Sequence, residues 1–253
     1  MTEPLSTPET PSRVFIRLGS IGAVAGCLIF MLANLAHPRS PDISDYEKQI
    51  NTVASSGIWI ADHLVFLLGA LLMTGGLLAI GRYLAADPRS APWARLADAL
   101  AISNVAIVAV LIALDGLASK EVHERAVHAA PSVRGGYFAA AQMMETIDAS
   151  IFSIWICTFF GLTFGLYAIA VLVGRQLPAL IGWIAGIGAS AALILGIIQG
   201  VDGLSKLVTN ELFVVAASTL NTWLLVTAVI LIRRDRATTD AEHSARTVPL
   251  LHV

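Results

Sequence analysis

Charged residues are scarce in this sequence. Only 13% of the 253 residues are Asp, Glu, Lys or Arg, whereas 56% are hydrophobic. Soluble domains carry about 25% charged residues, so this composition excludes an ordinary soluble domain and indicates an integral membrane protein whose partner is the lipid bilayer. No basic run is interleaved with aromatic residues, and we therefore expect no nucleic-acid partner.

Cysteines and familiar catalytic motifs are also lacking. Cys27 and Cys157 stand alone inside apolar stretches, which is typical of buried thiols and forms no CxxC or cysteine metal site. Residues 24–27, Val-Ala-Gly-Cys, fit a lipoprotein signal, but the apolar run continues through Leu32 and exceeds the roughly 7–15 residues of a signal, which favours a membrane span. The sequence contains no P-loop, GxSxG or HExxH pattern, and it identifies neither a cofactor nor a catalytic residue.

Six long apolar segments make up most of the chain. They cover about residues 14–36, 58–84, 93–118, 147–173, 179–204 and 212–232. Because about 20 apolar residues cross a bilayer as a helix, the sequence predicts an all-α integral membrane protein with six transmembrane helices in one domain, residues 13–236. The sixth span is expected to stop at 233–236, and the polar ends, 1–12 and 237–253, are predicted to be disordered.

The basic residues are unevenly divided between the two membrane faces. Six spans place both termini on one side, and 10 of the 16 basic residues fall there: Arg13, Arg17, Arg82, Arg89, Arg95, Arg175, Arg233, Arg234, Arg236 and Arg246. Cytoplasmic loops carry an excess of Lys and Arg. The sequence therefore predicts a multi-pass protein of the cell membrane with cytoplasmic N- and C-termini.

The fourth apolar segment is predicted to belong to a longer helix. Pro131 and the pair Gly135-Gly136 are expected to interrupt the helical structure ahead of this segment. A helix from about Tyr137 to Val173 would be about 55 Å long, whereas a hydrocarbon core is about 30 Å thick. Its first turns should therefore project from the membrane.

A short motif occurs twice. Residues 115–120 read Asp-Gly-Leu-Ala-Ser-Lys at the end of the third apolar segment, and residues 202–206 read Asp-Gly-Leu-Ser-Lys at the end of the fifth. One interpretation is a duplicated helical hairpin, with 58–120 and 147–206 related by an axis along the membrane normal. The other is a generic helix ending, in which Gly provides the C-cap and Lys meets the last carbonyls.

Ionisable residues near the spans gather at the face opposite the termini. The candidates for ligand or ion binding are His63, Asp115, Glu145, Asp148 and Asp202. Counting about 20 residues from the cytoplasmic ends places them near the membrane boundary rather than at the midplane. They form either a site open to the outer face or a belt of structural caps and ion pairs.

Three functions fit this distribution. The first is a small transporter or binding protein, in which Asp115 and Asp202 form a symmetric pair and His63 with Asp148 couples a proton or cation. The second is a membrane-embedded enzyme with a divalent metal that activates water, held by His63, Asp115 and Asp202 together with Asp148, since one His with carboxylates suits a hard or borderline cation. The third is a structural or accessory subunit.

Small and amide residues are expected to join the helices. Four GxxxG motifs, at 22–26, 161–165, 182–186 and 196–200, permit close backbone contact either within the chain or in a homo-oligomer. In-span amides are predicted to hydrogen-bond between helices: Asn34, Asn104, Gln199 and Asn221. Four tryptophans fit interfacial anchoring: Trp59, Trp93, Trp183 and Trp223.

Overall fold

The computed structural model describes residues 13–247, and every regular element in that range is helical. The elements are α1 (Arg13–Ala36), α2 (Tyr46–Ser55), α3 (Trp59–Leu84), α4 (Ala91–Leu111), η1 (Ile112–Ala118), α5 (Ser119–His128), α6 (Pro131–Trp155), η2 (Ile156–Thr163), α7 (Phe164–Val173), α8 (Ala179–Asp202), η3 (Lys206–Leu212) and α9 (Phe213–Thr247). The three η elements are π-helical. The predicted disordered N-terminus lies outside the described residues.

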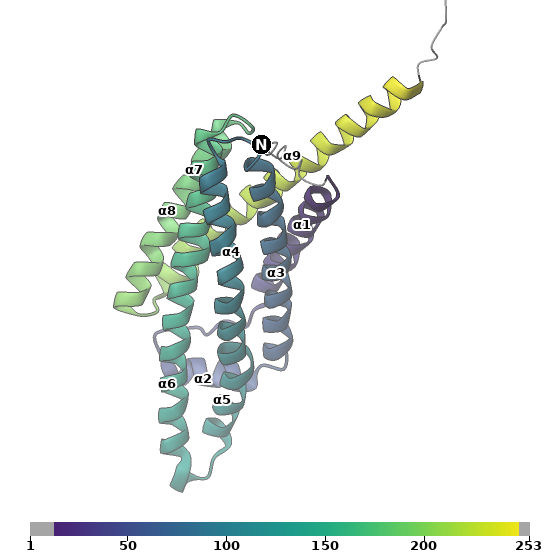
Figure 1. Ribbon diagram of the computed structural model, residues 1–253. Coiled ribbons are helices and arrows are strands. Elements are labelled where there is room, and N and C mark those ends of the chain that lie inside the picture. Colours follow the sequence, from purple (N-terminus) through teal and green to yellow (C-terminus); the bar gives the residue numbers. More distant parts are fainter. Residues whose placement is uncertain (1–12, 248–253) are drawn as a thin grey trace, which may run out of the picture.

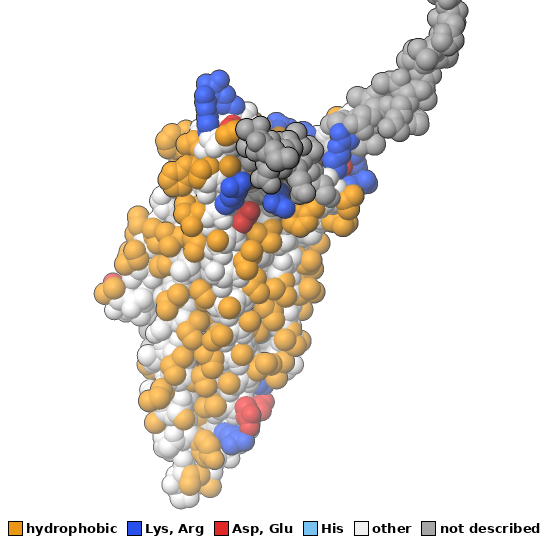
Figure 2. All heavy atoms as spheres, in the orientation of Figure 1, with side chains coloured by type: hydrophobic (Ala, Val, Ile, Leu, Met, Phe, Trp, Pro, Cys, Tyr) orange, Lys and Arg blue, Asp and Glu red, His pale blue; other side chains and the backbone are white. Residues whose placement is uncertain are grey.

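Six helices are long and apolar enough to cross a membrane, which confirms the predicted number of spans. They are Arg13–Ala36, Trp59–Leu84, Ala91–His128, Pro131–Val173, Ala179–Asp202 and Lys206–Ala237. Figure 2 shows hydrophobic side chains over most of the visible face, with Lys and Arg gathered at the end from which α1 starts. An apolar surface of this kind, together with the six apolar helices, indicates a bilayer environment.

Close backbone packing joins the helices into one bundle. The helix α1 packs along α3, α8 packs on α7 and α9, and α4 packs on α7 (Figure 1). A methyl group added at Gly26 would lie 2.7 Å from the backbone N of Met73, and one added at Gly161 would lie 2.9 Å from the Cβ of Leu193. All eight glycines of the GxxxG motifs face another helix of the same chain. The structure thus uses these motifs within the chain, and the homo-oligomer stays a prediction.

Two helices project at one end of the bundle, which we call the α2 end. The chain from α6 through η2 to α7 spans 43 residues, or about 65 Å at 1.5 Å per residue. Its first turns pair with α5 in a hairpin that extends beyond the other helices (Figure 1). That these turns project from the membrane stays a prediction. The expected break at Gly135-Gly136 is wrong: Pro131 starts α6, where its missing N–H is tolerated, and both glycines lie inside the helix.

The core of the bundle is aromatic. Trp155 stacks on Phe159 with ring centroids 5.5 Å apart, and Phe160 stacks on Phe164 at 6.1 Å. Phe159 and Phe160 lie in η2, and Trp155 and Phe164 flank it. The π-helical turn changes the direction of the side chains that follow. The four rings are at most 5% exposed, so they fix the position of α6 and α7 relative to the rest of the bundle.

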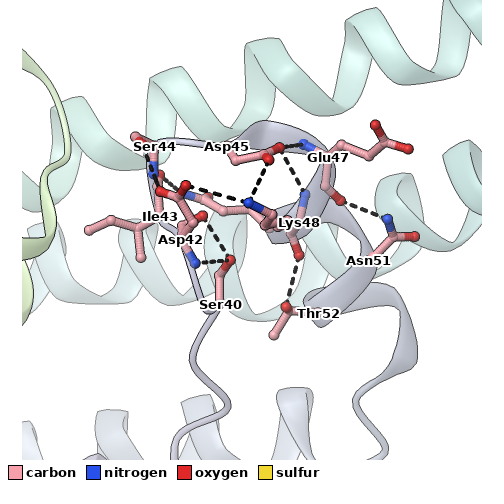
Figure 3. A network of polar contacts seen from close by, with 10 residues as sticks. Ser40, Asp42, Ile43, Ser44, Asp45, Glu47, Lys48, Asn51 and Thr52 are labelled. Atoms are coloured by element: carbon pink, nitrogen blue, oxygen red, sulfur yellow. Dashed lines mark hydrogen bonds and ion pairs between the residues drawn. The ribbon is translucent and has the colours of Figure 1, made fainter.

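The short helix α2 lies across the α2 end and is held at both of its ends. At its start, the Asp45 carboxylate accepts hydrogen bonds from the backbone N–H groups of Glu47 and Lys48, and the Lys48 ammonium lies 3.1 Å from Asp45 and 3.5 Å from Asp42 (Figure 3). Hydrogen bonds from Ser44 lower the pKa of Asp42, and the Lys48 side chain lowers that of Asp45.

The other end of α2 is capped by a residue of the repeated motif. The Lys120 ammonium donates hydrogen bonds to the carbonyls of Val53, Ala54 and Ser56 at 3.0, 2.8 and 2.8 Å. The last carbonyls of a helix lack intrahelical partners, and a cation there also meets the negative end of the helix dipole. Lys120 thereby joins α5 to α2.

The predicted amide contacts are largely present. Asn104 accepts a hydrogen bond from Thr158 at 2.7 Å, Gln199 donates to Ser153 at 3.0 Å, and Asn221 donates to the carbonyl of Cys27 at 3.3 Å. Each bond links helices distant in sequence, as expected for polar groups inside a bilayer.

Two expectations about chain ends and symmetry have a different outcome. The basic cluster at 233–236 does not end the last helix, because α9 continues to Thr247. The hairpin duplication is not confirmed: the third span continues through η1 into α5, whereas α8 stops at Asp202. Residues 248–253 lie outside the described residues.

Candidate functional site

A cavity of about 280 Å³ opens at the α2 end. Its walls come from the end of α1, the segment 37–43, α2, α3, η1, α6 and the start of α9. The ionisable side chains that line it are His37, Arg39, His63, Asp115, Glu145 and Asp148. The cavity therefore collects four of the five predicted site residues.

His63 lies one turn into α3 and is 2% exposed. Its Nδ1 is 2.8 Å from the carbonyl of Trp59, and its Nε2 is 3.1 Å from Oδ2 of Asp115. A carbonyl only accepts hydrogen bonds, so Nδ1 carries a proton and Nε2 of a neutral ring presents a lone pair to the Asp115 carboxylate. A proton or a cation between Nε2 and the carboxylate makes this contact favourable.

Asp115 is positioned by the π-helical segment η1. The Ser119 N–H bonds to the carbonyl of Leu114, five residues back, and the Asp115 carbonyl accepts hydrogen bonds from Trp59 Nε1 at 2.8 Å and from the Ser119 hydroxyl at 2.6 Å. Trp59 is 6% exposed, so its expected role as an interfacial anchor is wrong. A π-helical turn inside an α-helix is frequent at functional sites.

Gly116 brings η1 against α3. A methyl group at Gly116 would lie 2.6 Å from Cβ of His63, a distance that carbon atoms do not adopt without movement. The glycine thus permits the contact between His63 and Asp115. The close approach of His63 on α3, not a turn, explains why glycine stands there.

A second His–Asp pair adjoins the first. His37, in the segment after α1, places Nδ1 2.7 Å from Oδ2 of Asp62, which is 6% exposed. The His37 and His63 rings have centroids 5.2 Å apart. One potential ligand atom from each of His37, Asp62 and His63 lies within 4.8 Å of the other two.

Glu145 forms a buried pair with a histidine of the projecting hairpin. Its Oε1 lies 2.9 Å from Nε2 of His123, a residue with 0% exposure, and the His123 Nδ1 bonds to the Ser119 carbonyl. As at His63, Nδ1 donates to a carbonyl, so the contact between Nε2 and Glu145 requires a shared proton. The pair also joins α5 to α6.

Asp148 differs from the other acids because its carboxylate has no protein partner. The residue is 7% exposed, and neither Oδ1 nor Oδ2 makes a hydrogen bond with the described residues. It lies one turn beyond Glu145 on α6 and faces the cavity. An ionised carboxylate without a partner is costly to bury, so this group requires a proton or a positively charged ligand.

Asp202 is separated from the other predicted residues. It is exposed at the end of α8 and does not line the cavity. The structure therefore brings His63, Asp115, Glu145 and Asp148 together around one space but leaves Asp202 out. The expected pairing of Asp115 with Asp202 is not found.

The site also contains histidines that the sequence analysis did not select. They are His37, in the segment after α1, and His123, on α5. The sequence signal for His123 is its spacing from Ala126: the two are three residues apart and therefore share one face of α5. The structure shows that this face is buried, since Ala126 is 1% exposed. No comparable local pattern marks His37, whose partner Asp62 lies on another helix.

Arg39 is the one Lys or Arg among the described residues that line the cavity, and its guanidinium bonds to the carbonyl and side chain of Asn34. The remaining ionisable groups give the cavity an acidic character.

Comparison with known proteins found no matching family model, no matching curated protein and no matching solved structure. The function must therefore be argued from the site itself.

Proposed function

We propose that this multi-pass membrane protein binds a small organic cation in the cavity at the α2 end, as a transporter or binding protein. The observation that carries the proposal is Asp148, a buried carboxylate that faces the cavity without a protein partner. A positively charged group beside Asp148 would supply both the hydrogen bonds and the charge that the protein leaves unprovided.

The walls of the cavity support an organic ligand. Trp59, Phe66, Phe152, Trp155 and Phe213 contribute aromatic surface around the acids. Aromatic faces attract cations, and they also bury the hydrocarbon part of an amine. The volume of about 280 Å³ is close to the lower end, about 300 Å³, of the range usual for ligand pockets, so the cavity suits a small molecule.

We place this cavity at the outer face of the cell membrane, with both termini in the cytoplasm. The distribution of basic residues supports this orientation. Cysteine introduced at Asp45 or Arg125 should react with an impermeant thiol reagent added to intact cells, whereas cysteine at Arg89 should not. Reaction at Arg89 alone would reverse the orientation.

The binding proposal is tested with purified protein in detergent containing a chelator. Primary and quaternary amines of increasing size are compared with neutral molecules of the same shape by calorimetry and thermal shift. We expect the amines to bind and Asp148→Asn to weaken them at least ~30-fold, because removing one partner of a buried charge pair costs about 2 kcal/mol or more. Asp202→Asn is the matched control, since Asp202 is exposed. Equal binding of the neutral molecules, or unchanged affinity in Asp148→Asn, would overturn the proposal.

A second candidate function is a metal-dependent membrane enzyme. The His37, Asp62 and His63 cluster favours it, because these side chains offer three closely spaced ligand atoms. A structural role would remain if the cavity bound neither an organic cation nor a metal.

A further inference from the structure

We propose that His37, Asp62, His63 and Asp115 bind one divalent transition-metal ion, with Zn²⁺ as the first choice, beside the organic-cation site at Asp148. The four residues form two His–Asp pairs from the segment after α1, from α3 and from η1. The proposal concerns different side chains from those that carry the proposed function, and it stands or falls separately.

The spacing of the ligand atoms suits a single ion. Zn²⁺ binds His nitrogen and carboxylate oxygen at about 2.0–2.2 Å, so two ligands of a tetrahedral ion lie about 3.3–3.6 Å apart. Here Nδ1 of His37 is 2.7 Å from Oδ2 of Asp62, and Nε2 of His63 is 3.1 Å from Oδ2 of Asp115. The ligand atoms of His37, Asp62 and His63 all lie within 4.8 Å. The two paired distances are shorter than this spacing, and the 4.8 Å limit of the three-residue cluster is longer. Asp115 is linked to the cluster through its contact with His63, so binding of one ion by all four residues requires these side chains to move.

The surroundings of His63 resemble those of a metal ligand. A metal-binding histidine usually donates its second ring N–H to a carbonyl or carboxylate, which fixes the ring and its tautomer. His63 Nδ1 is 2.8 Å from the Trp59 carbonyl, and this leaves the Nε2 lone pair directed at Asp115. The indole of the same Trp59 holds the Asp115 carbonyl at 2.8 Å. One residue thus positions both members of the pair.

Charge and burial also favour a cation at this point. Asp62 is 6% exposed and His63 is 2% exposed, and the ion-pair partners of the two aspartates among the described residues are these histidines. Two carboxylates beside two neutral imidazoles carry two negative charges. A divalent ion would balance both, and two nitrogen with two oxygen ligands suit a borderline metal such as Zn²⁺.

An ion can reach the site through the cavity. His37, His63 and Asp115 all line it, and the His37 side chain is 25% exposed. Asp62 is buried and does not line the cavity. One side of the metal ion would therefore face the cavity, and the other side would face the helix bundle.

The experiment uses the full chain in detergent, stripped with a chelator and then titrated with Zn²⁺ without any organic ligand. We expect one ion per chain, and at least ~10-fold weaker binding in His37→Ala and in His63→Ala. His128→Ala is the matched control, because His128 is exposed on α5. The absorption bands of Co²⁺, added in place of Zn²⁺, should show nitrogen and oxygen coordination and should change in both site variants.

Two results would overturn the metal site: no bound ion in the stripped and reloaded protein, or equal Zn²⁺ affinity in His37→Ala, His128→Ala and the unaltered protein. If His63→Ala fails to fold, His37→Ala still decides the question, because His37 lies in a partly exposed segment. Amine binding is measured with chelator present, so failure of the metal site and failure of the proposed function give different results.

Discussion

The two Asp-Gly-Leu motifs have the same residues but different structures. Asp115 to Leu117 lie in η1, inside a helix that continues without interruption into α5. Asp202 is the last residue of α8, and Gly203 has φ 83° and ψ −175°, a conformation that essentially only glycine adopts. The second motif ends a helix, as a generic capping motif would. The first does not, and it positions Asp115 against His63 instead.

The comparison shows that one residue type can be required for unrelated reasons. Gly116 is needed because another helix approaches it, whereas Gly203 is needed because of its own backbone angles. The lysines differ as well: Lys120 caps α2, and Lys206 is exposed at the start of η3. Shared sequence therefore does not imply shared function in these two segments, and each residue pair provides a test.

The glycines should show the largest effects. Gly116→Ala and Gly203→Ala should each lower the free energy of unfolding by roughly 1–3 kcal/mol, the first through overpacking and the second through backbone strain. The combined change His63→Gly with Gly116→Ala should recover part of the loss, because glycine at position 63 lacks the Cβ that would lie 2.6 Å from the added methyl group. No substitution of His63 should rescue Gly203→Ala. Unfolding in mixed detergent measures each single and combined variant, and equal rescue of both glycines would contradict the assignment.

The lysines should differ by a smaller amount. Lys120→Met removes three hydrogen bonds to carbonyls at the end of α2 and should cost about 1–2 kcal/mol. Lys206→Met should stay within about 0.5 kcal/mol, as is usual for an exposed side chain. Hydrogen exchange should also show loss of protection in α2 for Lys120→Met alone. Protection of α2 unchanged by Lys120→Met would remove the proposed link between α5 and α2.

The aspartates should show a further, smaller contrast. In the presence of a chelator, Asp115→Ala should cost about 0.5–1.5 kcal/mol because it leaves the buried Nε2 of His63 without its partner. Asp202→Ala should cost less than about 0.5 kcal/mol. Thermal unfolding of both variants checks the difference. A larger effect for Asp202 would indicate that the second motif contributes more than a helix end.

The smallest effect is expected from acid. Asp42 and Asp45 have lowered pKa values in the folded protein, so their charged forms stabilise the start of α2. This stabilisation is complete above the ordinary aspartate pKa of about 3.9 and disappears as the pH falls through the lowered pKa values of the folded protein. Exchange at the Glu47 and Lys48 amides, corrected for intrinsic rates, should therefore increase below that pH.

The matched measurements for acid come from α2 and α8. The amide of Gly203, which bonds to the Gln199 carbonyl, should show no such transition. Asp45→Asn should keep the α2 cap at neutral pH, because an amide oxygen also accepts hydrogen bonds, and should reduce the acid effect. An equal loss of protection at Gly203 would show general acid unfolding instead.

The sequence by itself determined the number of spans and the end of the bundle at which ionisable residues collect. Both depend on local information, since an apolar run of sufficient length must form a helix in lipid whatever its neighbours. The amides of Asn104 and Gln199 were predictable for the same reason, because a polar group in a span needs a partner. The sequence also identified His63, Asp115, Glu145 and Asp148 as residues near one face.

Only the tertiary structure decided which of these side chains meet. His37 reaches Asp62 and His123 reaches Glu145 across different helices, and nothing in the adjacent sequence sets that pairing. The direction of each side chain depends on helix rotation, and one extra residue in a π-helical turn rotates everything after it by about 100°. The structure has such a turn at Asp115, whereas α8 has none ahead of Asp202. The two aspartates therefore face different surroundings: Asp115 lines the cavity and Asp202 lies exposed.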